Sequence, residues 1–536
     1  MNKKLVSIGL VVVMCLSMVV GCGKSTSKKV GDGSTLTVGI PQDFNISSYE
    51  DNALTDYFEE TLNIKLKFEY YSSTATNYIK QLSMSAASGQ ELPDVLVGFR
   101  DMSIVQMNEY GEDGIFEDLT ELIEKYGDNY KAQLKKLSKE EQERIKRKGT
   151  ADDGGFYSMP LYSSIYGVDN MQNLMYINQT WLDKLNLKAP TNIEELYTVL
   201  KAFKTQDPNG NKIADEIPLI GPGNGDQDVS GYILNAFLYY DVSNKWNVKN
   251  GKVSTPYTTD EYREALIFMN KLYNEDLLSK LTYTTSVADL KNLITPADGI
   301  SKVGIFGGHP LNVTDSTSSV LDEYVALGFL ADATGKGGYN VVRENTLMFG
   351  NFITSDCENT EIAMRFLDLF YADETVSRIR HGEKGVDWEE KAGKDSYGED
   401  AIVNVINDQA FFKGNSTWGG NFAGILTNYN YNAVSTVGQE NETYTSKLIT
   451  GTWKVMEQSK VPSEKAEDLH YTTEEYKAKS DIQASINSYV GEQMNLFIVG
   501  DNDINNDSVW KTYLKTLDDM QLDTLLDYAQ KAYDRK

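Results

Sequence analysis

Strand-like and helical segments alternate along the first hundred residues of this 536-residue chain. Residues 36–40 and 64–71 alternate apolar with polar side chains, as half-buried strands do, and a helical pattern at residues 52–62 separates them. A second helical segment at residues 78–87 leads to the apolar run at residues 95–99. Strands that alternate with helices form parallel sheets, in which ligands bind at the carboxyl ends of the strands. The pattern therefore predicts an α/β fold.

The N-terminus has the pattern of a secretory signal peptide at residues 1–21, with Lys3 and Lys4 followed by an apolar run. That run is shorter than the ~20 residues of a membrane-spanning helix, and the small polar residues 23–34 follow it as a flexible tether. The 515 residues beyond the signal exceed what one hydrophobic core supports. We therefore expect an exported protein with two or three domains.

Val19-Val20-Gly21-Cys22 resembles a bacterial lipobox. On this resemblance Cys22 receives a diacylglycerol and becomes the new N-terminus, and its acyl chains anchor the protein on the extracellular face of the cell membrane. The alternative is an ordinary signal peptide with a chance cysteine. Only Cys357 then remains as a thiol in the folded part, so no internal disulfide can form and the fold depends on its core.

The formal net charge of −27 disfavours contact with nucleic acid and with anionic lipid headgroups. Catalytic motifs are missing as well: the sequence has no His-Glu-x-x-His, no Gly-x-Ser-x-Gly and no phosphate-binding glycine loop, and its three histidines lie far apart. We therefore expect a protein without enzymatic activity.

Several short motifs occur in a fixed order along the mature chain. They are Ala87-Ser88-Gly89, Leu92-Pro93-Asp94, residues 110–120, residues 156–160, residues 174–178, residues 181–185, Phe352-Ile353-Thr354 and residues 510–534. Together with the lipobox, this order resembles the extracellular solute-binding proteins of ATP-driven importers, in particular the lipoprotein group with alginate- and oligosaccharide-binding members.

The resemblance implies a two-lobed, periplasmic-binding-protein-like (type II) fold with a hinge and a ligand cleft between the lobes. The N-terminal lobe would comprise residues 35–160 and 322–378, and the C-terminal lobe residues 161–321 and 379–536. The implied partners are an oligosaccharide in the cleft and the permease subunits of an ABC importer, and we expect a monomer.

Aromatic and polar residues in loop contexts are the candidates for the cleft, because sugar rings stack on aromatic side chains and sugar hydroxyls need polar partners. His309 is the strongest single candidate. The full set of predicted ligand-binding residues is Phe99, Arg100, Tyr162, Tyr166, Phe306, His309, Trp388 and Trp418.

Oxygen-bearing side chains alternate in the loop at residues 207–216, as in loops that bind a hard cation such as calcium. The loop is not an EF-hand, because Lys212 replaces the turn glycine and Pro218 occupies the closing position. The family resemblance implies a structural calcium ion whose ligands, by position, are Asp207, Asn209, Asn211, the carbonyl of Ile213, Asp215 and Glu216. The alternative is a solvated turn without an ion.

Three other functions stay open at this point. The protein could bind a peptide, a polyol or another nutrient in the same fold. It could be a surface glycosidase or lyase, although the carboxylates are too numerous to single out a catalytic pair. It could also be a sensory binding protein, which would share the fold and differ in its partner.

Overall fold

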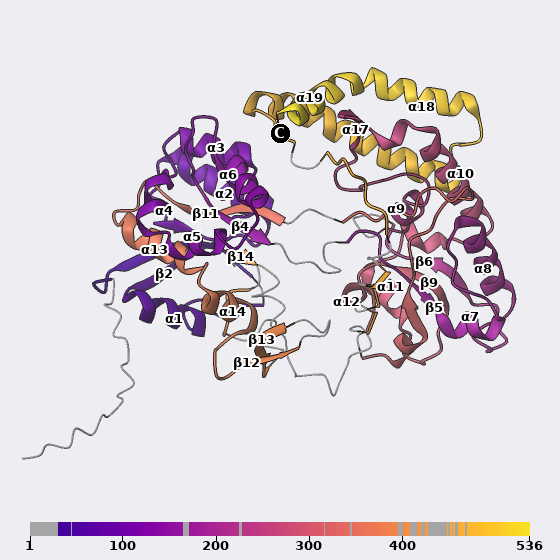
Figure 1. Cartoon of the computed structure of the whole chain (residues 1–536), viewed down its shortest axis with the longest axis horizontal. Coiled ribbons are helices and arrows are strands. Elements are labelled where there is room, and N and C mark those ends of the chain that lie inside the picture. The colour runs from indigo at the N-terminus through magenta and orange to yellow at the C-terminus, as the bar shows by residue number, and fades with distance from the viewer. Residues whose placement is uncertain are drawn as a thin grey trace, which may run out of the picture.

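The computed structural model has two lobes that lie side by side, joined at one edge by a layer of C-terminal helices (Figure 1). It describes residues 31–43, 45–163, 171–223, 228–315, 317–342, 346–394, 400–407, 415–419, 424–426, 447–448, 451–452, 454–455, 459–466 and 469–535. The signal peptide, Cys22 and most of the tether lie outside these residues. Within them, no helix is both long and apolar enough to cross a membrane.

A six-stranded mixed sheet in the order β14-β4-β11-β3-β1-β2 forms the centre of the N-terminal lobe. Strand β1, next to the edge strand β2, pairs in parallel with both β2 and β3, which confirms the parallel sheet predicted for this segment. β11 pairs antiparallel with β3 and β4, and β14 adds in parallel to β4. The strands are β1 (Thr35–Pro41), β2 (Lys65–Tyr71), β3 (Val95–Leu96), β4 (Met159–Ser163), β11 (Thr346–Ile353) and β14 (Ile425–Leu426).

The helices of this lobe begin at side-chain caps that the sequence encodes. Asn52 accepts a hydrogen bond from the backbone N–H of Leu54 at the start of α1, and Ser103 and Ser138 form capping boxes at α3 and α6. Asn63 ends α1 in the left-handed conformation. The helices are α1 (Ala53–Leu62), α2 (Ala75–Ser88), α3 (Ile104–Glu112), α4 (Thr120–Tyr126), α5 (Asp128–Leu134), α6 (Lys139–Gly149), α13 (Thr360–Leu369) and α14 (Asp373–His381), and the hairpin β12 (Trp388–Lys394) with β13 (Asp400–Val405) follows α14.

The C-terminal lobe has a four-stranded sheet in the order β10-β5-β9-β6, in which β6 and β9 are parallel and the other pairs are antiparallel. Its strands are β5 (Met175–Asn178), β6 (Ile217–Ile220), β9 (Val303–Gly307) and β10 (Tyr324–Ala326), and a small hairpin comprises β7 (Asn247–Lys249) and β8 (Lys252–Ser254). Its helices are α7 (Gln179–Leu185), α8 (Ile193–Thr205), α9 (Val229–Leu234), α10 (Asp260–Asn274), α11 (Val287–Ile294) and α12 (Pro310–Val313), with 3-10 turns η2 (Pro256–Thr258), η3 (Lys280–Tyr283) and η4 (Ser319–Glu323).

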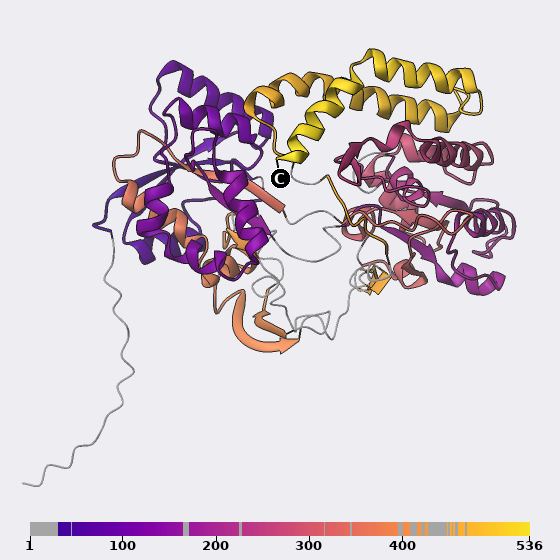
Figure 2. The same cartoon turned by 45° about the horizontal axis from the view of Figure 1, so that its top comes forward.

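Three C-terminal helices, α17 (Thr473–Val499), α18 (Asp507–Asp519) and α19 (Leu522–Asp534), pack on the C-terminal lobe. Phe497 and Trp510 belong to the same buried cluster as Leu266 of α10, and Arg263 of α10 forms an ion pair with Asp507 at 2.9 Å. The N-terminal end of α17 reaches toward the other lobe (Figure 2). This helical layer therefore spans the gap above the two sheets.

Two of the expected lobe boundaries differ from the observed strand pairing. β10 lies in residues assigned to the N-terminal lobe, but it pairs with β5, and the hydroxyl of Tyr324 donates a hydrogen bond to the carbonyl of Val303 at 2.5 Å. Conversely, Trp418 and β14 belong to the core and the sheet of the N-terminal lobe. We propose revised lobes of residues 31–163 with 346–426, and 171–342 with 447–535.

Trp418 tests this assignment because it is fully buried in the N-terminal lobe, where its ring packs on Phe58 and Phe68 and its indole N–H donates to Thr55 Oγ1 at 2.9 Å. We expect Trp418→Ala to lower the free energy of unfolding by about 3–5 kcal/mol, and Trp418→Phe to lower it less, because the alanine leaves a larger cavity. Denaturant unfolding measures both. A Trp418→Ala variant with unchanged stability would contradict the core assignment.

Candidate functional site

The two lobes enclose a cavity of about 580 Å³. This volume lies in the range of small-ligand sites, which span about 300–1,000 Å³. Its wall includes the loop after β3, the start of α3, the end of α6, the loop before β7, strand β11 and the start of α17. Because segments from both lobes line one cavity, a ligand held there would contact both lobes at once.

Strand geometry brings Arg100 into the wall from the N-terminal lobe. β11 has a bulge between Phe349 and Asn351, and the carbonyl of Gly350 accepts a hydrogen bond from the backbone N–H of Phe99 at 2.9 Å. A Cβ on Gly350 would lie 2.7 Å from the backbone nitrogen of Arg100, so only glycine allows this close approach. The bulge therefore fixes the turn that carries the Arg100 guanidinium.

The C-terminal lobe contributes a polar loop with a rigid backbone. Asp241 Oδ1 accepts hydrogen bonds from Gln172 Nε2 at 3.0 Å and from the backbone N–H groups of Ser243 and Asn244 at 2.9 and 3.1 Å. Trp246 ends this loop and is almost completely buried against the lobe core, with one side in the cavity wall. The loop thus presents amide and hydroxyl groups in a fixed arrangement.

The start of α17 supplies a cluster of two tyrosines and a lysine. The Lys479 ammonium lies 4.4 Å from the ring centroid of Tyr471 and 4.8 Å from that of Tyr476, and it donates to Gln483 Oε1 at 2.5 Å. Burial lowers the pKa of Lys479 and raises that of the Tyr471 hydroxyl. Tyr476 is 37% exposed and offers an open aromatic face.

The same end of α17 also touches the N-terminal lobe directly. Thr473 Oγ1 donates to Asp152 Oδ2 at 2.9 Å, and Lys477 forms an ion pair with Glu109 of α3. α17 itself is anchored in the C-terminal lobe, so these contacts link the two lobes at the rim of the cavity. Both are solvent-exposed polar contacts, which contribute little energy and can break when the lobes move apart.

Of the predicted ligand-binding residues that the structure describes, only Arg100 lines this cavity. Phe99, Phe306 and Trp418 are fully buried core residues. Their aromatic partners occupy their faces: Phe99 packs edge-on to Tyr71 and Tyr78, and Phe306 stacks on Tyr176. These three rings thus belong to the core in this structure, because glycine-rich and charged sequence neighbours do not reveal which side chains the tertiary structure covers.

The remaining predicted residues lie elsewhere. Tyr162 is buried in β4, and its hydroxyl donates to Glu141 Oε1 at 2.5 Å. His309 follows β9 and is 5% exposed; its carbonyl accepts from the backbone N–H groups of Asn312 and Val313, so it starts α12. Tyr166 lies outside the described residues.

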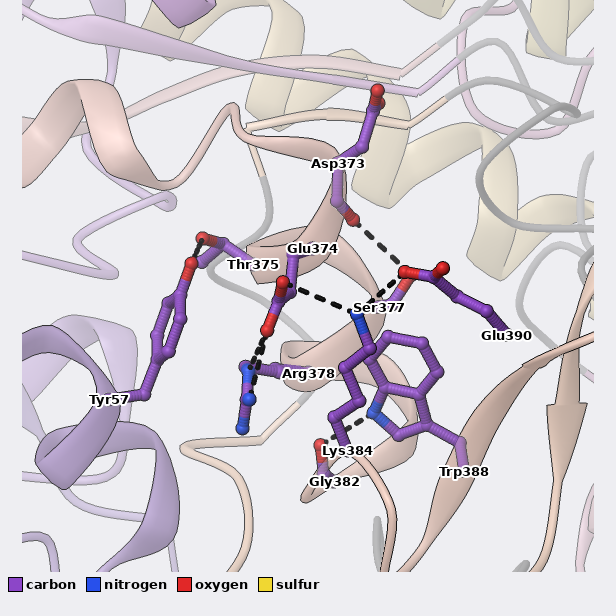
Figure 3. Close-up of polar contacts among 10 residues, drawn as sticks. All are labelled: Tyr57, Asp373, Glu374, Thr375, Ser377, Arg378, Gly382, Lys384, Trp388 and Glu390. Atoms are coloured by element: carbon purple, nitrogen blue, oxygen red, sulfur yellow. Dashed lines mark hydrogen bonds and ion pairs between the residues drawn. The ribbon is translucent and has the colours of Figure 1, made fainter. Parts of the chain in front are cut away.

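Trp388 is also buried, and Figure 3 shows the polar contacts around it. Its indole N–H donates to the carbonyl of Gly382 at 2.9 Å, while Lys384 lies over its ring and forms ion pairs with Glu390 at 2.6 Å and Glu374 at 3.5 Å. These contacts attach the β12–β13 hairpin to α14, so Trp388 has a structural role here.

The sequence analysis missed Trp246, Tyr471, Tyr476 and Lys479, which all line the cavity. One signal was available, since Thr472 and Glu475 form the capping box that begins α17 just after Tyr471. Nothing in the sequence indicates that the first turns of this helix reach the opposite lobe.

The loop at residues 207–216 holds its carboxylates and amides close together through local hydrogen bonds. Asn209 Nδ2 and Asn211 Nδ2 donate to Asp215 Oδ1 at 3.2 and 3.0 Å, and Lys302 pairs with Asp215 Oδ2 at 3.3 Å. Asp207 accepts from the backbone N–H of Lys212, and the Ile213 carbonyl accepts from that of Asp215. In this arrangement several of the predicted calcium ligands are hydrogen-bonded to one another.

Glu216 is the residue of this loop whose environment suits a cation. Its Oε1 is buried and has no hydrogen-bond partner in the described part of the chain, and burial, together with the charges of Asp207 and Asp215, raises its pKa. The described residues nevertheless contain no group of three His, Cys, Asp or Glu side chains arranged to hold a metal ion. The donor set fits calcium, but binding would require the Asn209 and Asn211 side chains to turn their oxygens inward.

The two-lobed α/β fold and the interlobe cavity define a solute-binding protein of the hinged type. The chain belongs to the bacterial extracellular solute-binding protein family, whose model matches residues 45–376.

The chain is also similar in sequence to two named bacterial proteins. The chain is 28% identical to the fructooligosaccharide ABC transporter substrate-binding protein FusA of Streptococcus pneumoniae over 490 residues, which cover 89% of this chain and 86% of FusA. It is also 28% identical to Lipoprotein LipO of Bacillus subtilis over 279 residues, about half of either chain.

Solved structures share the fold at low sequence identity. An extracellular solute-binding protein from Bifidobacterium longum subsp. infantis matches with a TM-score of 0.75 at 22% identity, over 94% of this chain and 98% of the other. FusA in complex with kestose matches with a TM-score of 0.72 at 22% identity, over 94% and 99%. An EF-hand mutant of FusA in complex with fructo-nystose matches with a TM-score of 0.71 at 23% identity, with the same coverage.

His470 reports on the electrostatics of the cavity wall. Burial lowers its pKa, and the charge of Lys148 lowers it further, while Asp152 acts in the opposite direction. We expect an NMR titration to give His470 a midpoint below 6.5, the usual histidine value. The contribution of His470 to stability is then fully present above pH 6.5 and is lost as the pH falls toward the folded-state pKa. A His470→Gln variant assigns the signal, and a midpoint at or above 6.5 would contradict this reading.

Proposed function

We propose that this protein is the substrate-binding component of an ABC importer and captures an oligosaccharide in the cavity between its lobes. The observation that carries the proposal is the composition of the cavity wall, which combines the exposed ring of Tyr476 with the amide and hydroxyl groups of the loop before β7. Sugar rings stack on aromatic faces and exchange hydrogen bonds with such polar groups. The ligand named for the relative FusA, a fructooligosaccharide, supports the same class.

The topology supports a hinge mechanism. The chain passes between the lobes between β4 and β5, between β10 and β11, and between β14 and α17. A ligand that touches both walls binds the closed arrangement more tightly than the open one, so it shifts the population toward closure. The permease would receive the closed, loaded form. No catalytic step is proposed, because the family is one of binding proteins.

We also propose that the protein is attached to the outer face of the cell membrane through Cys22. The lipobox-like sequence before Cys22 supports this, and so does the similarity to a relative named as a lipoprotein. Residues 31–34 of the predicted tether are hydrogen-bonded to the N-terminal lobe, so residues 23–30 would be the part that holds the lobes at a distance from the bilayer while allowing them to reach a permease.

A structural calcium ion in the loop at residues 207–216 is a further part of the proposal. Asp207, Asn209, Asn211, Asp215 and Glu216 would hold it with the carbonyl of Ile213. Support comes from the buried, unpartnered Oε1 of Glu216 and from the relative FusA, for which an EF-hand mutant is described. When bound, the ion would supply positive charge among three carboxylates and tie this loop to the end of α8.

The ligand class can be tested by thermal shift of the mature protein, residues 23–536, against matched panels of oligosaccharides and peptides. A saccharide that binds the folded state raises the melting temperature by mass action. We expect Tyr476→Ala to weaken saccharide binding by roughly ten-fold, about 1.4 kcal/mol, without destabilising the fold. Tyr70→Ala is the matched control, because Tyr70 is similarly exposed, at 42%, and lies outside the cavity. A response to peptides alone would overturn the oligosaccharide proposal.

Calcium binding can be tested by the same melting measurement. We expect calcium at 100 times its dissociation constant to add about 2.7 kcal/mol of stability, and a chelator to remove it. The double variant Asp207→Ala, Glu216→Gln should abolish the response, whereas Asp332→Asn, in another loop where an aspartate accepts backbone hydrogen bonds, should keep it. A calcium response that persists in the double variant would place the ion elsewhere.

A further inference from the structure

Lys479 is a buried cation in the cavity wall, and its role rests on the proposed binding function. The residue is 8% exposed, and its ammonium group lies against the rings of Tyr471 and Tyr476. Its single hydrogen-bond acceptor among the described residues is the side-chain amide of Gln483. No carboxylate in the described part of the chain forms an ion pair with it.

A buried ammonium is costly unless an anion or several acceptors compensate it. An ammonium has three donor hydrogens, and here one protein acceptor and two aromatic faces serve them. The neighbouring hydroxyl of Tyr471 is buried as well, and it has no hydrogen-bond partner among the described residues. The Tyr471 hydroxyl thus has no acceptor among the described residues, and the Lys479 ammonium has one acceptor for its three hydrogens.

The charged residues around the cavity also favour an anionic ligand. Its wall contains the cations Arg100, Lys148 and Lys479 and the carboxylates Asp152 and Asp241. Both carboxylates already accept hydrogen bonds within the protein, Asp152 from Thr473 and Asp241 from the loop before β7. Arg100 also forms an ion pair with Asp101 at 4.0 Å, whereas Lys479 places a positive charge in this wall without a paired carboxylate among the described residues, in a chain whose net charge is −27. Such a local field concentrates anions at the site against the repulsion of the remaining surface.

We propose that the ligand is an acidic oligosaccharide, and that Lys479 and the hydroxyl of Tyr471 receive one of its carboxylates. A carboxylate oxygen accepts from both an ammonium and a phenol, and hydrogen bonds to a charged acceptor are the strong ones. The aromatic face of Tyr476 lies beside this position and can stack on the ring that bears the carboxylate. Lys479 then determines specificity for acidic over neutral sugars.

The first test compares matched ligand pairs on the wild-type mature protein by calorimetry. Oligogalacturonides, oligomannuronides and sialyllactose are each paired with a neutral counterpart: the carboxyl-reduced oligosaccharides for the first two and lactose for the third. We expect at least one acidic member to bind ten-fold or more tightly than its neutral partner, and added salt to weaken only the acidic member. This comparison needs no variant and does not depend on how well a substituted protein folds.

The second test uses Lys479→Met, which keeps the apolar stem and removes the charge, and Tyr471→Phe, which removes only the hydroxyl. We expect Lys479→Met to weaken the acidic ligand at least ten-fold and the neutral counterpart less than two-fold, with a melting temperature equal to or above that of the wild type. Lys511→Met, an exposed site on α18 outside the cavity, is the matched control. An equal loss of affinity for acidic and neutral ligands would show that Lys479 acts through packing alone, and would overturn its assignment as a specificity residue.

Different results would disprove the acidic-ligand inference and the proposed oligosaccharide-binding function. Binding of neutral oligosaccharides with no preference for any acidic member would overturn the acidic-ligand inference and leave the proposed function intact. Binding of peptides with no saccharide response at all would overturn both.

Discussion

The pairing of β4 with β11 and β14 is the constraint on which the two-lobed architecture depends. These strands come from residues 159–163, 346–353 and 425–426, so one sheet is assembled from three distant parts of the chain. Between β4 and β11 the chain leaves this sheet, forms the sheet of the second lobe and returns. The lobes are therefore each discontinuous in sequence, and described residues of both lobes line the cavity between them.

The same strand pairing shapes one wall of the cavity. The bulge in β11 places Gly350 against the backbone of Arg100, and the hydrogen bond from Phe99 to Gly350 fixes that approach. The opposite wall depends on a long-range contact of another kind, because α17 is held in the C-terminal lobe by its packing against α10 while its first turns reach Asp152 and Glu109. Rigid elements thus present polar groups from both lobes, and these two contacts between the lobes are exposed polar contacts that contribute little energy.

The hydrogen bonds of buried polar groups distinguish side chains that serve the fold from those that are suited to contact a ligand. Trp388 and Trp418 have their indole N–H groups satisfied by protein acceptors, and each ring is covered by its own lobe. The Tyr471 hydroxyl has no hydrogen-bond partner among the described residues, the Lys479 ammonium beside it has only Gln483 as an acceptor there, and both residues line the cavity. Since folding normally pairs such groups, the unpaired ones are informative about what the cavity receives.

The sequence by itself determined the local elements, the class of fold and the family. Helix caps such as Asn52 and Ser103 and the alternating strands at residues 36–40 and 64–71 depend on neighbours a few positions away, so their patterns are visible in one dimension. The sequence also indicated Arg100, because it follows a strand. It could not place Trp418, β10 or the α17 cluster, since their burial depends on which distant segments pack against them. Only the tertiary structure decided that a lysine within a helix faces a cavity between two lobes, because that depends on where the two ends of α17 are anchored.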